Sequence, residues 1–199
     1  MRIAFHHIAY QPLAICNALS MERLEAAVAR AALKPGATVM DIGCAYGEIS
    51  MSLARAFNAR VTAVELDPAM AAEAEARIQK AGLTDRITVQ RETSATALES
   101  HPPFDLIVAI GATEPAGKGQ REPAAVFSVL AEHLTPGGAL LWGDLFWKSE
   151  PPAPLRQLVE TSGYYVSHEE WQAAAREAGL EVASAEISGD AEWAAYRTA

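Results

Sequence analysis

The residues with the clearest potential for chemistry lie where the first apolar run of the chain meets a glycine-rich turn. Residues 41–48 read DIGCAYGE, so Asp41 is followed closely by Gly43 and Gly47. Glycines let the backbone turn tightly and approach a ligand, and a following helix presents its first N–H groups to that ligand. The turn therefore predicts a ligand site at the end of a first strand.

A second carboxylate, Glu65, ends the next apolar run and suits a nucleoside. It can accept hydrogen bonds from both ribose hydroxyls of an adenosine, each contributing about 1.5–3 kcal/mol. Nicotinamide dinucleotides are held similarly, but their loop requires a G-x-G-x-x-G spacing. From Gly43, those positions hold Gly43, Ala45 and Glu48, and a glutamate cannot serve as the third, packing glycine. A nicotinamide-dependent oxidoreductase therefore stays only as an alternative.

Three further polar residues are candidates for acting on a substrate. Asp144 follows the apolar run 138–143 and has aromatic neighbours that could form apolar walls, while Glu114 follows the run 104–110. His7 lies in the opening segment and could act as a base or orient a substrate. Each also has a structural interpretation: Asp144 could cap a turn, and His7 could be exposed or merely packed.

Short apolar runs alternate with longer Ala- and Glu-rich segments, which is typical of a sheet whose strands are joined by helices. We expect strands at 37–42, 59–66, 86–90, 104–110 and 138–143, and helices at 47–57, 68–81, 121–134 and 168–178. Helical crossovers predict parallel strands, whose carboxyl ends share one edge. The candidate residues should meet at that edge.

Two more strand-like segments, 180–187 and 191–198, predict a C-terminal antiparallel hairpin. The expected fold is α/β: a doubly wound, mostly parallel seven-stranded sheet with helices on both faces. We expect a single domain over 1–199. Residues 1–34 should form an N-terminal helical cap, and the proline- and aromatic-rich stretch 144–167 is expected to be a substrate lid.

The composition of the chain limits the classes of molecule that it can bind. The 199 residues carry 16 Lys and Arg against 25 Asp and Glu, a net charge of -9 that disfavours nucleic acid. No apolar run is long enough to span a membrane, and no secretory signal is evident, so we expect a cytoplasmic protein with a small-molecule substrate. The two cysteines form no disulfide framework, and no metal site is expected. The sequence leaves monomer and homodimer open.

Four motifs, VMDIGCAYGE, VTAVELDP, FDLIVAIGATE and LTPGGALLWGD, occur in an order and spacing that resemble class I S-adenosylmethionine-dependent methyltransferases. The resemblance covers residues 37–143 and implies a Rossmann-like fold. The opening FHHIAYQPLAICNALSMERL and the stretch WGDLFWKSEP are similar to a small-molecule-modifying branch of that family.

The resemblance implies a cofactor, S-adenosyl-L-methionine, and residues that would contact it. Glu65 would hold the ribose hydroxyls, Leu66 would pack on the adenine, and one of Glu92, Thr93 or Ser94 would meet the adenine amino group. The other implied contacts are Asp41, Gly43, Cys44, Ala45, Gly47 and Ile110. Cys44 is expected to be a packing residue, and Ala45 replaces the commonest glycine, which the loop tolerates if its φ stays negative.

The implied reaction is an in-line displacement that moves the cofactor's methyl group to a small organic acceptor. If the acceptor must lose a proton, Asp144, Glu114 or His7 would be the base. A sulfur or neutral amine acceptor would need none. A non-catalytic S-adenosylmethionine-binding or regulatory protein is the main alternative.

Overall fold

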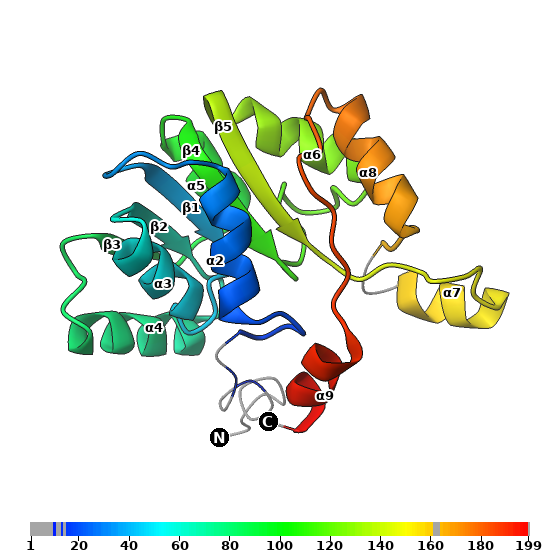
Figure 1. Cartoon of the computed structure of the whole chain (residues 1–199), viewed down its shortest axis with the longest axis horizontal. Helices are drawn as coiled ribbons and strands as arrows, with labels where there is room; N and C mark the ends of the chain where they lie inside the picture. Colours follow the sequence, from blue (N-terminus) through cyan, green and yellow to red (C-terminus); the bar gives the residue numbers. More distant parts are fainter. Residues whose placement is uncertain (1–9, 11–12, 14, 161–163, 199) are drawn as a thin grey trace.

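The computed structural model describes residues 10, 13, 15–160 and 164–198, and shows one sheet with helices on both faces (Figure 1). Its strands are β1 (Thr38–Ile42), β2 (Arg60–Val64), β3 (Ile87–Gln90), β4 (Phe104–Ile110) and β5 (Leu134–Gly143). They lie in the order β3-β2-β1-β4-β5, and every neighbouring pair is parallel. This confirms the predicted α/β class and all five predicted parallel strands.

The helices that join or flank these strands are α2 (Met21–Arg30), α3 (Glu48–Ala56), α4 (Pro68–Lys80), α5 (Ser94–Ser100), α6 (Pro123–Glu132), α7 (Ala153–Glu160), α8 (His168–Glu177) and α9 (Asp190–Thr198). Four were predicted from their patterns, and their observed ends lie within two residues of the predicted ones. Caps explain several boundaries. Asp67 accepts N–H bonds from Ala69 and Met70 at the start of α4, where Pro68 occupies the first helical position.

Two apolar cores separate the layers. On one face, α2, α3 and α4 pack through residues such as Leu24, Leu53 and Ile78 against the sheet. On the other, Leu98 of α5 and Leu130 of α6 do the same. Successive side chains of β1 and β4 alternate between these cores, because strand side chains point to opposite faces. Both faces of the central strands are therefore covered, as a parallel sheet requires.

The C-terminal hairpin and the count of seven strands were wrong. Among the described residues the sheet has five strands; residues 180–189 form neither helix nor strand, and 190–198 form α9. Asp190 and Glu192 favour a helix start at α9, whose residues are otherwise rich in alanine. Residues 180–187 form no strand beside β5, and Glu186 makes ion pairs with Arg23 and Arg30 of α2.

The structure describes only part of the predicted N-terminal cap and of the predicted lid. α2 lies within the predicted cap 1–34, whereas residues 1–9, 11–12 and 14 lie outside the described part of the chain. The predicted lid 144–167 contains α7, which stands away from the sheet in Figure 1. None of the helices among the described residues is long and apolar enough to cross a membrane.

Candidate functional site

The predicted glycine turn forms a loop between β1 and α3 that folds against the end of β2. The N–H groups of Gly43 and Cys44 both donate to the carbonyl of Val64, at 2.9 and 3.0 Å. Gly43 and Gly47 have φ of +70° and +80°, a left-handed conformation that glycine adopts without strain. Ala45 has φ of +51°, so the condition of a negative φ stated for alanine there is not met, and the loop holds a strained alanine.

Glu65 explains why Ala45 takes that conformation. Its Oε2 accepts the Ala45 N–H at 2.9 Å, and its Oε1 accepts the Asp67 N–H at 2.9 Å. The half-buried carboxylate thus joins the loop to the end of β2 and keeps lone pairs for further donors. Beside it, Leu66 is 67% exposed, an apolar surface that a ring could cover. These two residues have the chemistry that an adenosine requires.

Asp41 lies beneath the loop and does not face the cleft. It is 2% exposed and accepts hydrogen bonds from Ser50, one from its hydroxyl at 2.6 Å and one from its N–H. Burial raises the pKa of this carboxyl to about 6, more than the bonds from Ser50 lower it. Asp41 therefore fixes α3 to β1 and supports the loop from below. Ser50 was missed, since its sequence position gives no sign that it faces Asp41.

Cys44 is 5% exposed, and burial raises the pKa of its thiol well above the ordinary value. A thiol that holds its proton this tightly is a poor nucleophile, which agrees with the packing role expected for it. Ile110, at the end of β4, reaches the same cavity wall as Gly43 and Ala45. The structure therefore brings these predicted contacts together with Glu65 at one edge of the sheet.

Thr93 and Ser94 begin α5 near that edge, but their hydroxyls are engaged locally. Thr93 caps α5 by accepting the Thr96 N–H, and Ser94 donates to the carbonyl of Glu114 at 3.3 Å. Glu92 precedes them and is half-buried. The structure leaves open which of the three could meet an adenine.

The two described candidates for a base differ in their surroundings. The Glu114 carboxylate accepts the Gly119 N–H at 3.0 Å and faces Arg121 at 3.3 Å, and these contacts lower its pKa. Asp144, at the end of β5, accepts only the Leu145 N–H among the described residues, and burial raises its pKa to about 6. Asp144 is therefore the better proton acceptor near neutral pH. His7 lies outside the described residues.

Aromatic side chains pack together in the segment that follows Asp144, and one of them, Tyr165, lies within electrostatic range of it. Trp147 packs edge-on against Tyr165, with ring centroids 6.3 Å apart, and Phe146 packs against His168 at 5.4 Å. Burial, and then the charge of Asp144, raise the pKa of Tyr165. The segment after β5 thus folds back on the start of α8 and gives the carboxylate an apolar setting. Aromatic neighbours of Asp144 were expected from the sequence, but Tyr165, which lies much further along the chain, was missed.

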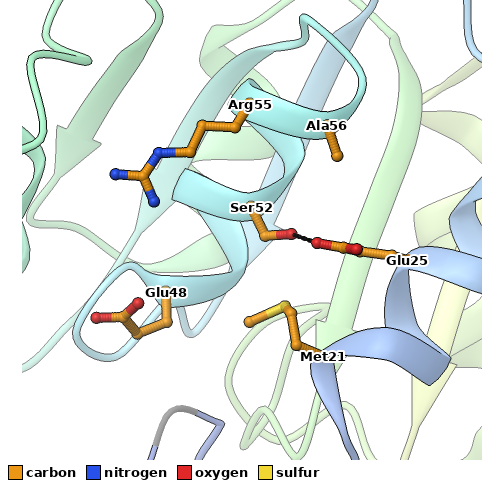
Figure 2. A pocket seen from close by; sticks show the side chains of 6 residues that line it. All are labelled: Met21, Glu25, Glu48, Ser52, Arg55 and Ala56. Carbon is orange, nitrogen blue, oxygen red and sulfur yellow. Dashed lines mark hydrogen bonds between the residues drawn. The ribbon is translucent and has the colours of Figure 1, made fainter.

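Two cavities lie at the start of α3, and Glu48 lines both. Between the glycine loop and residues 15–17 lies a space of about 30 Å³, lined also by Tyr46 and Ile110. The other, of about 390 Å³, opens between α2 and α3 (Figure 2). Its lining residues are Met21, Glu25, Glu48, Ser52, Arg55 and Ala56. Ser52 donates a hydrogen bond to Glu25 across it.

Comparison with known families gives one match that covers most of the chain. The family model described as mycolic acid cyclopropane synthetase matches residues 13–186. That range includes the glycine loop, Glu65 and Asp144, so it covers the whole described edge of the sheet on which the candidate residues lie.

Relatives and solved structures agree with this match. The chain is 29% identical over 160 residues to the 27-O-demethylrifamycin SV methyltransferase of Amycolatopsis mediterranei, covering 77% of this chain and 57% of that one. It is 33% identical over 129 residues to the ubiquinone biosynthesis O-methyltransferase of Xanthomonas campestris pv. campestris, covering 65% and 51%. The chain thus spans about half the length of the curated relatives it matches.

A solved SAM-dependent methyltransferase from Geobacter sulfurreducens, in complex with S-adenosyl-L-homocysteine, is similar in structure. It superposes with a TM-score of 0.79 and 25% identity, over 96% of this chain and 76% of that one. The similarity extends beyond residues 37–143, on which the motifs alone had rested.

Proposed function

The chain belongs to the mycolic acid cyclopropane synthetase family, and on that premise we propose that it transfers a methyl group from S-adenosyl-L-methionine to a small organic acceptor. The observation that carries the proposal is the pairing of the glycine loop with Glu65 at the carboxyl edge of a parallel sheet. Ligands bind at this edge in doubly wound folds. The family match supports the predicted resemblance to S-adenosylmethionine-dependent methyltransferases.

The residues present fit the adenosine half of this cofactor in their chemistry. Glu65 would hold the ribose hydroxyls with its remaining lone pairs, and the exposed Leu66 would pack on the adenine. Gly43, with no side chain, lets the backbone approach the ligand beside Ala112. When bound, the cofactor supplies an electrophilic methyl group on a sulfonium leaving group. The protein aligns the acceptor and excludes water.

Asp144 is the residue we propose as the general base. It lies at the end of β5, and its apolar setting keeps its pKa near neutrality, where a base works best. An acceptor hydroxyl suits this arrangement, because its proton must leave as the new bond to carbon forms. The rate of methyl transfer should then rise with pH through about 6, and Asp144→Asn should remove that rise.

The two relatives named above methylate, by their names, a rifamycin and a ubiquinone precursor. The aromatic side chains around Asp144 favour acceptors of the same general kind, small organic molecules with apolar rings. The net charge of -9 favours them over nucleic acid.

Calorimetric titration with S-adenosylhomocysteine, with NADH as the comparison ligand, tests the cofactor. We expect micromolar binding of the first alone. Glu65→Ala should weaken it at least tenfold, a loss of about 1.4 kcal/mol, because the ribose hydroxyls lose their acceptor. Glu132→Ala, an exposed glutamate at the end of α6, is the matched control and should bind as the wild type does.

Other results would point elsewhere. Unchanged affinity in Glu65→Ala would refute the role of Glu65, and binding of NADH alone would favour the oxidoreductase alternative. Cofactor binding without methyl transfer to any of a panel of phenols, amines and thiols would favour the non-catalytic alternative.

A further inference from the structure

Residues 15–17 occupy the space in front of the glycine loop. Together with Gly43, Cys44 and Ala45 they enclose only about 30 Å³, whereas ligand pockets commonly measure about 300–1,000 Å³. Ile15 is buried in the same apolar core as Cys44. In Figure 1 the blue chain that precedes α2 lies at the end of the sheet to which the arrowheads of β4 and β5 point.

Cys16 places this segment beside the proposed ribose-binding carboxylate. The residue is half-buried, and burial, with the negative charge of Glu65 as the next cause, raises the pKa of its thiol to about 11. Cys16 and Tyr46 also line the same cavity wall. The segment therefore covers the cleft next to Glu65.

Asn17 fastens the segment to the end of β4. Its Nδ2 donates to the carbonyl of Ile110 at 3.2 Å. Its amide also fills the place of a side chain at Gly111: a Cβ there would lie 2.5 Å from Nδ2 and 2.8 Å from Oδ1. Real Cβ atoms do not approach other atoms so closely, so the amide and any side chain at position 111 exclude each other.

We infer that residues 15–17 form a latch that occupies the cofactor cleft, and that Asn17, seated on Gly111, holds it closed until S-adenosylmethionine displaces it. The inference rests on the proposed function, which places the cofactor at the glycine loop. A lid usually closes over a bound ligand, whereas the closed state of this latch excludes the ligand. The contact is an autoinhibitory one within a single chain.

A closed state that excludes the ligand lowers its apparent affinity by the fraction of molecules that are open. Asn17→Ala removes the hydrogen bond to Ile110 and shifts the chain toward the open state. One such bond corresponds to a change of about twofold to tenfold in that equilibrium. We therefore expect S-adenosylhomocysteine to bind about twofold to tenfold more tightly to Asn17→Ala, with a faster association rate.

Gly111→Ala tests the same contact from the other side, because its methyl group would expel the Asn17 amide. Alanine at φ of +64° is also strained, so Gly82→Ala serves as the matched control: its φ is +70°, and nothing lies within 4 Å of the added methyl group. Gly111→Ala should tighten binding as Asn17→Ala does, and Gly82→Ala should leave it unchanged. In the double variant Asn17→Ala/Gly111→Ala, the second substitution should add little.

The experiment is calorimetric and stopped-flow binding of S-adenosylhomocysteine to these four variants and the wild type, each checked for folding by circular dichroism. Deuterium uptake by residues 15–19 of the wild type provides a readout without substitution and should rise when the ligand binds. Equal or weaker binding by Asn17→Ala, or a fall in that uptake, would overturn the latch while leaving the cofactor in place. Absence of binding in every protein, wild type included, would overturn the proposed cofactor and the latch together.

Discussion

Three carboxylates at the carboxyl edge of the sheet have different roles because their surroundings differ. Asp41 is sealed under α3 and bonded to Ser50, Glu65 is half-buried and bonded to backbone N–H groups, and Asp144 sits among aromatic rings. Only Glu65 and Asp144 could touch a ligand. Asp41 acts through the loop that it supports, so its substitution should affect stability more directly than chemistry.

Asp41 should make the protein less stable as pH rises through about 6. Its pKa in the folded chain is about 6 against 3.8 for the ordinary carboxyl, so the folded state binds the proton more tightly. The resulting stabilisation is fully present below about pH 4 and is lost above about pH 6, a difference of about 3 kcal/mol. Urea unfolding of wild type and Asp41→Asn between pH 4 and 8 measures it.

Asp144 titrates in the same range and in the same direction, so Asp144→Asn is the matched comparison. The fall in the free energy of unfolding with rising pH should be smaller in each single variant than in the wild type, and smallest in the double variant. The difference between wild type and Asp41→Asn isolates this contribution from the carboxylates whose pKa values are lowered, and a pH dependence that Asp41→Asn leaves intact would contradict the burial of a protonated Asp41.

At the scale of elements, the two helices that follow β5 in the chain are held very differently. α8 begins with a capping box between Ser167 and Glu170, and its Trp171 packs against Trp142 and Phe127 of the core. α7 has no buried residue and is tied to the body by contacts such as that of Arg121 with the carbonyl of Glu160. α7 can therefore move without disturbing the sheet.

Limited trypsin digestion should cut first at Lys148 or Arg156, on the segment that carries α7. Local unfolding there exposes little apolar surface and so costs little free energy. Mass spectrometry of the first fragments identifies the site. Arg77 and Arg86, which flank the α4–β3 connection, provide the internal comparison, and earlier cleavage there would show that α7 is held more firmly than its burial indicates.

At the scale of the whole molecule, charged contacts join the two ends of the described chain. Arg23 of α2 pairs with Glu186 and Glu192, and Arg30 pairs with Glu186. The Ser20 N–H, at the start of α2, also donates to Glu192. α9 therefore docks on the N-terminal helix through polar contacts, whereas the sheet and its covering helices share apolar cores.

Arg23→Ala should release α9 without unfolding the sheet. Deuterium uptake by residues 190–198 should rise, and uptake by β1 and β4 should stay unchanged, because exposed ion pairs contribute little to global stability. Salt at 0.5 M should have a similar effect through screening. Arg55→Ala is the control, since Arg55 is exposed and makes no ion pair among the described residues. Unchanged uptake in Arg23→Ala would mean that other contacts hold α9.

The sequence by itself determined the parallel sheet, the position of the glycine loop and the position of Glu65 at the end of the second strand. These features depend on local signals: apolar runs of strand length, helix caps and glycine spacing. Those signals also supported the family resemblance that the comparisons confirmed. They failed for 180–198, where an alternating pattern predicted a hairpin and the chain formed an ion-paired segment and α9. Strand formation requires a partner edge, which local pattern does not supply.

Only the tertiary structure decided which polar groups meet. It paired Ser50 with Asp41, bound Ala45 to Glu65 at a positive φ, and bonded Asn17 to the carbonyl of Ile110. Each contact joins residues from separate elements, and its geometry depends on how those elements pack. The physical reason is the same in all three: a hydrogen bond needs its atoms within about 3 Å, a precision that residue type and spacing do not contain.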